Sequence, residues 1–172
     1  MRSVCRVEVG STLRVGMING TLGTATVTSA GNNCIECSVV LGEPPPPPLP
    51  LTLILAMPRP KSLKKALESA AALGIKKIYL IETWRVEKSY WTSPVLNTES
   101  LNKHLLLGLE QGRDTIVPEI SIRKRFKPFV EDELEETGQY VVTQTSLAVD
   151  TFEIGEIAYS TKIQRISADG TG

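Results

Sequence analysis

The sequence predicts an α/β protein in which a small all-β segment precedes a parallel sheet. Residues 51–57 form an almost continuous apolar run, which is typical of a strand buried on both faces of a covered parallel sheet. A helical pattern and a second apolar run at 75–81 follow it, so the three stretches predict a β-α-β unit. The first 42 residues instead alternate in short apolar runs between turn signals, as antiparallel strands do.

Four short strands are predicted in the N-terminal segment, residues 1–42. They lie in the stretches CRVEV, TLRVG, GTATVT and CIECSVVL, at intervals of about ten residues. Turn signals separate them at Gly10, at Asn19-Gly20 and at residues 31–33. This spacing favours a small barrel or sandwich.

Residues 43–50, EPPPPPLP, form the predicted boundary between the two parts of the chain. Five consecutive prolines favour a polyproline II rod that rises about 3.1 Å per residue. We interpret the run as a stiff linker. The alternative is a docking site for an SH3-like or EVH1-like partner, because such domains bind polyproline II segments.

The α/β part is predicted to span residues 51–129. Pro58 and Pro60 end its first strand, Ser62 is the expected helix N-cap, and Gly74 is expected to close the helix in the left-handed conformation. The apolar positions of this helix fall on one stripe that faces the sheet: Leu63, Leu67, Ala70 and Ala71. The crossover to the next strand should be right-handed.

A second helix and two later segments follow. Thr98 or Ser100 is the expected N-cap of a helix whose leucines recur every four residues and which ends at Gly112. A short strand is expected in IVPEISI, residues 116–122. Residues 130–172 form an acidic tail of unassigned structure with strand candidates at 139–143 and 152–159.

The formal net charge of zero conceals a division along the chain. Residues 59–129 contain fourteen Lys or Arg and seven Asp or Glu, whereas residues 130–172 contain two and nine. A strongly basic segment indicates a polyanion partner such as nucleic acid, because phosphates neutralised by cations release counterions. The alternative is that the charges segregate in sequence and mix in space.

The loop after the first predicted parallel strand, PRPKS, contains no glycine, so it does not fit a dinucleotide site or a P-loop. It contains cations instead: Arg59, Lys61, Lys64 and Lys65 gather at the carboxyl end of a strand, where open α/β sheets place their ligands. A basic and aromatic stretch, RKRFKPF, follows at 123–129, as single-strand nucleic-acid surfaces often have. An ordinary solvated helix face is the alternative for the loop cations.

Three cysteines and one histidine give weak evidence for a metal site. Cys34 and Cys37 form a C-x-x-C, but no second pair follows and His104 is far away in sequence, so no metal is predicted. The odd cysteine number suits a reducing compartment. No apolar run approaches the roughly 20 residues that span a bilayer, and no leader is evident, so the chain is expected in the cytoplasm.

The order of these elements resembles the RsmE-type methyltransferases, which methylate N3 of a uridine in small-subunit (16S) ribosomal RNA. The resemblance rests on LILAMPRPKSLKKALESAAALGIKKIYLIET, on Trp84-Arg85-Val86, and on LEQGRDTIVPEI. It is good over residues 51–122 and fainter over 2–42. It implies a PUA-like β-barrel followed by a SPOUT-class α/β domain, whose C-terminal trefoil knot binds S-adenosylmethionine and makes a homodimer.

The resemblance also implies a glycine turn like GPEGG and a later segment like LRxETA, which carry the cofactor in that family. Residues 130–172 contain neither, so the SPOUT-like sheet is expected to be incomplete and no catalytic or cofactor-binding residue is assigned. A non-catalytic RNA-binding fragment or scaffold is therefore the alternative function.

The RNA side of the site can be assigned. Arginine and lysine bind phosphates, and arginine can do so with two parallel hydrogen bonds. The residues predicted to contact ribosomal RNA are Arg6, Arg59, Lys61, Lys64, Arg85 and Arg113. Arg85 and Arg113 lie in segments that match the family. The partner expected for this surface is ribosomal RNA or the small ribosomal subunit.

Overall fold

The computed structural model describes most of the chain up to residue 125 and short pieces after it. The described residues are 8–31, 34–82, 86–125, 128–129, 132, 140–143 and 163–164. They divide into two units, and each is described by itself. The first holds Met1–Pro46 with Asp114–Ile116, and the second holds Pro47–Arg113 with Val117–Gly172.

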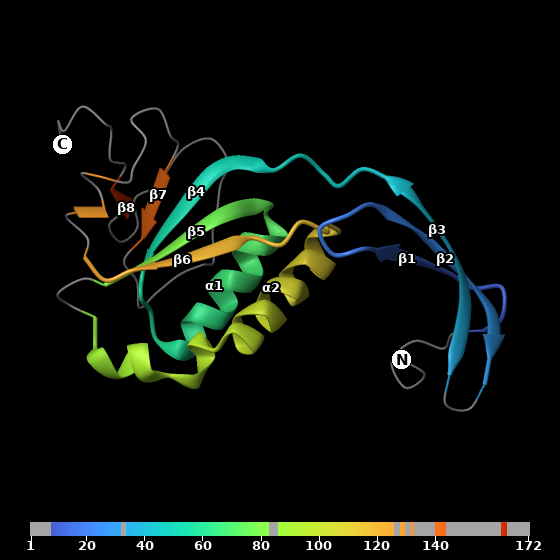
Figure 1. Cartoon of the computed structure of the whole chain (residues 1–172), viewed down its shortest axis with the longest axis horizontal. Coiled ribbons are helices and arrows are strands. Elements are labelled where there is room, and N and C mark those ends of the chain that lie inside the picture. Colours follow the sequence, from blue (N-terminus) through green and yellow to red (C-terminus); the bar gives the residue numbers. More distant parts are fainter. Residues whose placement is uncertain are drawn as a thin grey trace. The chain divides into compact units, whose positions relative to one another are not determined.

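The first unit contains a three-stranded antiparallel sheet (Figure 1). Its strands are β1 (Thr12–Gly16), β2 (Leu22–Ala30) and β3 (Ile35–Glu43), in the order β1-β2-β3. Three of the four predicted N-terminal strands are thus confirmed. The other prediction, CRVEV, falls mostly on residues 1–7, outside the described residues. The described strands do not close on themselves, so the PUA-like barrel stays a prediction.

The turn between β1 and β2 is the predicted Asn19-Gly20 turn. Asn19 has a φ of 57°, in the left-handed region that asparagine tolerates better than most residues. The Met17 N–H donates to the Thr21 carbonyl oxygen at 3.0 Å across the turn. Local turn chemistry therefore suffices to place this hairpin.

The proline run joins two strands directly. β3 ends at Glu43 and β4 (Leu49–Ala56) begins six residues later, so Pro44–Pro48 make up the whole connection. These prolines are in neither helix nor strand, and all but Pro45 are exposed. Leu49 and Pro50, which the sequence analysis placed in the linker of residues 43–50, belong to β4.

The second unit is a mixed sheet that is mostly parallel. Its order is β6-β5-β4-β7-β8, where β5 is Ile75–Ile81, β6 is Glu119–Arg123, β7 is Tyr140–Thr143 and β8 is Ile163–Gln164. All neighbours pair in parallel except β7 and β8, which pair antiparallel. The predicted β-α-β unit is confirmed as β4, α1 and β5.

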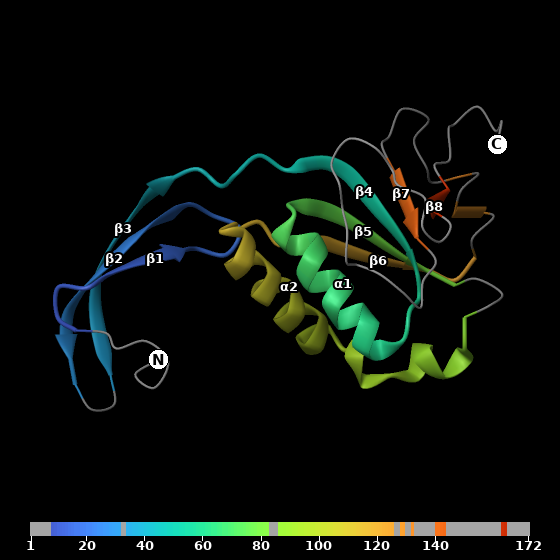
Figure 2. The ribbon, with the colours of Figure 1, turned by 180° about the vertical axis from the view of Figure 1, so that it is seen from behind.

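Two helices cover one face of this sheet, as Figures 1 and 2 show from opposite sides. α1 spans Pro60–Ala72 and α2 spans Thr98–Gly112. Two short 3-10 helices, η1 (Lys88–Thr92) and η2 (Pro94–Leu96), precede α2. None of the helices in the described parts of the chain has the length and hydropathy that crossing a bilayer requires.

β7 lies within residues 130–172, the segment that the sequence analysis described as an acidic tail. The strand candidate at 139–143 is found as β7 and pairs with β4, with Thr52 opposite Tyr140 and Leu55 opposite Thr143. β4 is therefore an inner strand with a neighbour on each side. The parallel sheet thus extends past the predicted limit of residue 129. The other candidate, 152–159, lies outside the described residues.

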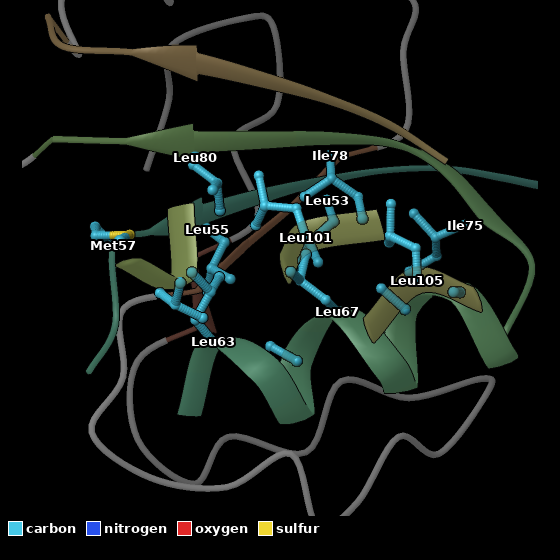
Figure 3. Packing of buried hydrophobic residues seen from close by; sticks show 14 of the residues in the cluster. Leu53, Leu55, Met57, Leu63, Leu67, Ile75, Ile78, Leu80, Leu101 and Leu105 are labelled. Atoms are coloured by element: carbon cyan, nitrogen blue, oxygen red, sulfur yellow. The ribbon is translucent and has the colours of Figure 1, made fainter. Parts of the chain in front are cut away.

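The sheet is buried on both faces by two separate apolar clusters. On the helix-covered face, Leu53, Leu55, Ile78 and Leu80 pack with helix residues such as Leu67 (Figure 3). The cluster on the other face consists of Ile54, Ala56, Tyr79, Ile81 and Phe129. Alternating residues of β4 and β5 therefore enter opposite clusters, which explains why these strands are apolar throughout.

Both predicted helix N-caps are wrong by a few residues. α1 begins at Pro60 with Arg59 as N-cap, and Ser62 lies inside the helix. Proline is favoured at the first helical position because its fixed φ suits the helix and it has no N–H to leave unpaired. α2 is capped by Asn97, whose side-chain oxygen accepts from the Glu99 N–H at 3.0 Å. Gly74 is confirmed in the left-handed region, with a φ of 82°.

Candidate nucleic-acid interface

The carboxyl ends of β4, β5 and β6 meet at one edge of the sheet. The Met57 N–H donates to the Ile81 carbonyl oxygen at 3.0 Å, and the Glu82 N–H donates to the Arg123 carbonyl oxygen at 3.0 Å. The residues that follow β4 and those that end β6 are therefore at the same edge. This edge is where open α/β sheets usually bind their ligands.

The N-terminus of α1 lies at this edge, and its N-cap and first two turns contain four cations. Arg59, Lys61, Lys64 and Lys65 are all exposed, and the first turn contains no acidic residue. The N-cap makes no side-chain hydrogen bond to the helix. Because a helix N-terminus carries a partial positive charge, cations there are unfavourable unless an anion binds. A phosphate group would offset both the helix charge and the lysines.

β6 brings more positive charge to the same edge. Lys124 and Arg125 are exposed, and Arg123 is partly buried with its guanidinium carbon 5.7 Å from the centre of the Tyr79 ring. We call six exposed residues the basic edge: Arg59, Lys61, Lys64, Lys65, Lys124 and Arg125. Sequence reasoning noted the basic stretch at 123–129 but did not include it among the RNA-binding residues. The parallel pairing of β6 with β5 places Arg123 opposite Ile81, so the basic stretch begins at the same edge of the sheet as the loop after β4.

Arg113 lies at the opposite edge of the same sheet. It follows α2, whose last residue, Gly112, packs against Ala72 at the end of α1. The connection after α1 is in turn tied to the start of β4, since the Leu49 N–H donates to the Gly74 carbonyl oxygen at 3.0 Å. Arg113 is therefore separated from Arg59 by about the length of β4.

Eight residues of β4 correspond to about 25 Å at roughly 3.3 Å per residue. The structure thus brings Arg59, Lys61 and Lys64 together and leaves Arg113 apart from them. The remaining predicted RNA contacts, Arg6 and Arg85, lie outside the described residues.

Arg113 has an unusual backbone conformation for a long side chain. It is the C-cap of α2, with φ 51° and ψ 44°, and its N–H donates to the Leu109 carbonyl oxygen. The helix ends at Gly112, as the sequence predicted. A β-carbon on Gly112 would come within 2.6 Å of the Ala72 carbonyl oxygen. Helix packing therefore requires the glycine and moves the left-handed position to the next residue.

Arg14 of the N-terminal sheet is paired with an acid. Its guanidinium donates to both carboxylate oxygens of Glu43, at 2.8 and 2.5 Å, across β1 and β3. These hydrogen bonds hold the pKa of the Glu43 carboxyl below its ordinary value, and they raise the pKa of Arg14. Arg14 and Glu43 thus form an exposed ion pair within the N-terminal sheet.

The potential metal ligands are dispersed. Cys34 and Cys37 are exposed free thiols, and His104 Nδ1 lies 2.6 Å from Glu68 Oε1 between the two helices. Within the described ranges, no group of three or more His, Cys, Asp or Glu side chains is arranged to hold an ion.

Comparison with known families identifies the second unit. A family model described as an RNA methyltransferase domain matches residues 45–166. The chain belongs to this family. The match begins within the proline run and continues past β8, so the RNA methyltransferase domain includes the strands that residues 130–172 add to the sheet.

Two curated relatives are similar to the chain. "Ribosomal RNA small subunit methyltransferase E" of Treponema pallidum is 29% identical over 152 residues, which are 88% of this chain and 56% of that protein. "Ribosomal RNA small subunit methyltransferase E 1" of Borreliella burgdorferi is 36% identical over 69 residues, covering 40% of this chain and 29% of that protein. The predicted resemblance to RsmE-type enzymes is confirmed. The chain spans about half or less of the length of these relatives.

Solved structures show the same fold. A small-subunit methyltransferase E from Neisseria gonorrhoeae, described as bound to S-adenosyl methionine, superposes with a TM-score of 0.61 at 16% identity. That alignment covers 78% of this chain and 56% of the other. A putative methyltransferase from Legionella pneumophila, described with bound cofactor SAM, gives 0.55 at 19% identity and covers 79% and 57%. These likenesses confirm the SPOUT-like parallel sheet.

Proposed function

We propose that this chain acts on small-subunit ribosomal RNA as an S-adenosylmethionine-dependent methyltransferase of the RsmE type, with N3 of a uridine as the acceptor. Family membership supports methyl transfer to RNA. The names of the curated relatives support a ribosomal substrate. A homodimer built through the C-terminal knot and a cytoplasmic location form part of the same proposal.

The observation that carries the RNA-binding part is the basic edge. Two of its cations, Arg59 and Lys61, lie at the N-cap and in the first turn of α1, which contain neither a capping side-chain hydrogen bond nor an acid, and Lys64 and Lys65 follow in the next turn. Such an arrangement lowers the stability of the isolated helix, since like charges meet there. An RNA backbone supplies the anions that offset this cost, and its affinity should then depend strongly on salt.

The cofactor would supply a methyl group on a positively charged sulfur. Transfer requires the acceptor nitrogen in line with that methyl group and loss of the uridine N3 proton, so positioning and a nearby base are needed. The sequence lacks the glycine turn that the resemblance implies, and the six residues of the basic edge are all cations. We therefore assign this chain's described residues to holding and orienting RNA, and no methyl-transfer step to any of them.

RNA binding is tested by removing charge from the basic edge. The double variant Lys61→Ala/Lys64→Ala should bind a transcript of small-subunit ribosomal RNA more weakly, and its plot of log affinity against log salt should flatten by about 1.5 if both lysines contact phosphate. Lys103→Ala removes another exposed charge, from the middle of α2, and is the control. Equal losses in the two proteins would contradict the assignment.

Catalysis is tested with the cofactor. S-adenosylmethionine at a hundred times its dissociation constant should stabilise a competent protein by about 2.7 kcal/mol, and transfer of a labelled methyl group to the transcript should follow. The second candidate function, a non-catalytic RNA-binding fragment or scaffold, is favoured by the missing glycine turn. It predicts salt-sensitive RNA affinity with no thermal shift and no methyl transfer.

A further inference from the structure

β6 is an outer strand of the sheet in the second unit (Figure 1). Within the described residues it pairs with β5 alone, at one end of the strand order. One of its large apolar side chains, Ile122, is 40% exposed. An outer strand with an exposed apolar side chain is a surface on which a strand of another chain can pair.

The main-chain groups of β6 that point away from β5 belong to Ile120 and Ile122. The Glu82 N–H donates to the Arg123 carbonyl oxygen at 3.0 Å, so Arg123 directs its carbonyl group toward β5. Successive residues of a strand direct their main-chain N–H and C=O groups to opposite sides. Ile122 and Ile120 therefore direct theirs to the open side of the sheet.

The Ile122 carbonyl group supports this direction. Its oxygen accepts a hydrogen bond from the guanidinium of the next residue, Arg123, at 3.1 Å. A carbonyl oxygen has two lone pairs, so it can also accept from the main chain of another strand. The open side of β6 thus offers both donors and acceptors to a partner strand.

The sequence of β6, EISIR, is complementary to itself when two copies run antiparallel. A two-fold axis at Ser121 places Ile120 of one copy opposite Ile122 of the other, and Glu119 opposite Arg123. The isoleucine pairs are the ones whose main-chain groups face the open side, so each pair can exchange both of its hydrogen bonds. The outer pairs oppose a carboxylate and a guanidinium, which attract each other.

The side chains also agree with this register. Ile120 packs against the cluster on the helix-covered face, and Ile122, two residues further on, lies on the same face of the strand. In the antiparallel pair, Ile122 of each copy would lie beside Ile120 of the other. The exposed apolar surface of Ile122 would then be covered.

We propose that β6 is an interface at which a second copy of this chain pairs antiparallel about Ser121, so that the two sheets become one. The pairing does not depend on RNA binding, and it is separate from the homodimer proposed at the C-terminal knot. A five-residue strand buries little area, so the contact should be weak and should increase with protein concentration.

The main-chain bonds are tested with proline at position 122. Ile122→Pro removes an N–H that faces the open side and none that bonds to β5, so the sheet of the single chain can still form. In sedimentation velocity, the wild-type protein should reach a higher mass at high concentration than the Ile122→Pro protein. Ile122→Val keeps the N–H and a β-branched side chain, so this matched control should associate as the wild type does.

The register is tested with cysteine in a chain whose three native cysteines are replaced by serine. Two copies of position 121 would face each other with Cα atoms about 4.5 Å apart, as in a non-hydrogen-bonded antiparallel pair, which is within the reach of a disulfide. Ser121→Cys should therefore give a covalent dimer under mild oxidation. Glu119→Cys is the control, because its two copies would lie about 13 Å apart along the strands and should not be linked.

Two results would overturn the proposal. One is an Ile122→Pro protein with the mass of the wild type at every concentration. The other is a Glu119→Cys protein that is linked as readily as Ser121→Cys. If Ile122→Pro does not fold, the two cysteine variants decide the question. The proposed function is tested separately by the RNA affinity of Lys61→Ala/Lys64→Ala, so the two failures are distinguishable.

Discussion

Gly108 of α2 lies so close to Ala71 of α1 that a β-carbon at position 108 would come within 2.7 Å of the Ala71 β-carbon. It would also collide with the Glu68 carbonyl oxygen. The two helices that cover the sheet therefore touch almost backbone to backbone at this point. The spacing of α2 from α1, and with it the position of the end of α2, depends on this glycine.

Replacing Gly108 with alanine should lower the free energy of unfolding by about 2 kcal/mol, because overpacking forces the helices apart. Helix propensity alone predicts the opposite sign, a gain of about 1 kcal/mol. Urea denaturation distinguishes the two effects. Leu107→Ala, one residue earlier and on the exposed side of α2, is the control and should change stability much less. A stabilised Gly108→Ala protein would contradict the close approach.

Replacing Arg113 with glycine should raise stability while weakening RNA binding. Glycine adopts the left-handed conformation without steric cost, so the gain should be about 1 kcal/mol in the free energy of unfolding. Arg113→Ala should lose the same RNA affinity without that gain. Thermal unfolding and RNA titration of both variants provide the measurement. Equal stabilities of the glycine and alanine variants would argue against strain at this position.

Replacing Glu43 with glutamine should reduce the dependence of stability on pH in the acid range. Since Arg14 holds the pKa of the folded Glu43 carboxyl below its ordinary value, the ion pair stabilises the fold above the unfolded pKa. That contribution is lost as the pH falls through the folded pKa. Wild-type protein should therefore lose more stability than Glu43→Gln between about pH 6 and pH 3.

The control for the Glu43 prediction is Glu36→Gln, which removes an exposed carboxylate from the same strand and leaves the Arg14 pair in place. It should retain the wild-type loss of stability on acidification. Denaturant titrations at each pH provide the measurement. Parallel pH curves for wild-type and Glu43→Gln proteins would show that the pair contributes nothing measurable, as exposed ion pairs sometimes do.

Replacing Leu67 with alanine should destabilise the second unit strongly. Leu67 is 0% exposed and packs between α1 and the sheet, so its truncation leaves a cavity and should cost about 3 kcal/mol. Leu73→Ala removes a leucine that is 40% exposed at the end of the same helix and should cost far less. Urea denaturation provides the comparison, and similar losses in both variants would contradict the packing in Figure 3.

Sequence patterns predicted the elements of the α/β part well. The β-α-β unit from Leu49 to Ile81, the second helix and the Asn19-Gly20 turn are all present, since each depends on residues close in sequence. The caps were placed less well. Ser62 is a suitable cap residue, but Pro60 lies earlier and is favoured at the first position of α1. Thr98 is also suitable, but Asn97 lies before it and caps α2.

The candidate site was only partly predictable. The cations of the PRPKS loop were placed correctly at the carboxyl end of β4, because a loop must follow its strand. The contribution of Lys124 and Arg125 to the same edge depends on β6 pairing in parallel with β5, more than 40 residues away in sequence. The spacing of basic residues along the chain does not contain that information.

By itself, the sequence determined which segments are strands and helices and that the middle of the chain is cationic, because hydrophobic period and charge are local properties. Only the tertiary structure decided that β7 lies beside β4 and that Arg113 stands a strand's length away from Arg59. These relationships depend on pairing between distant segments. They are settled by which arrangement buries both faces of the sheet, and no local pattern records that choice.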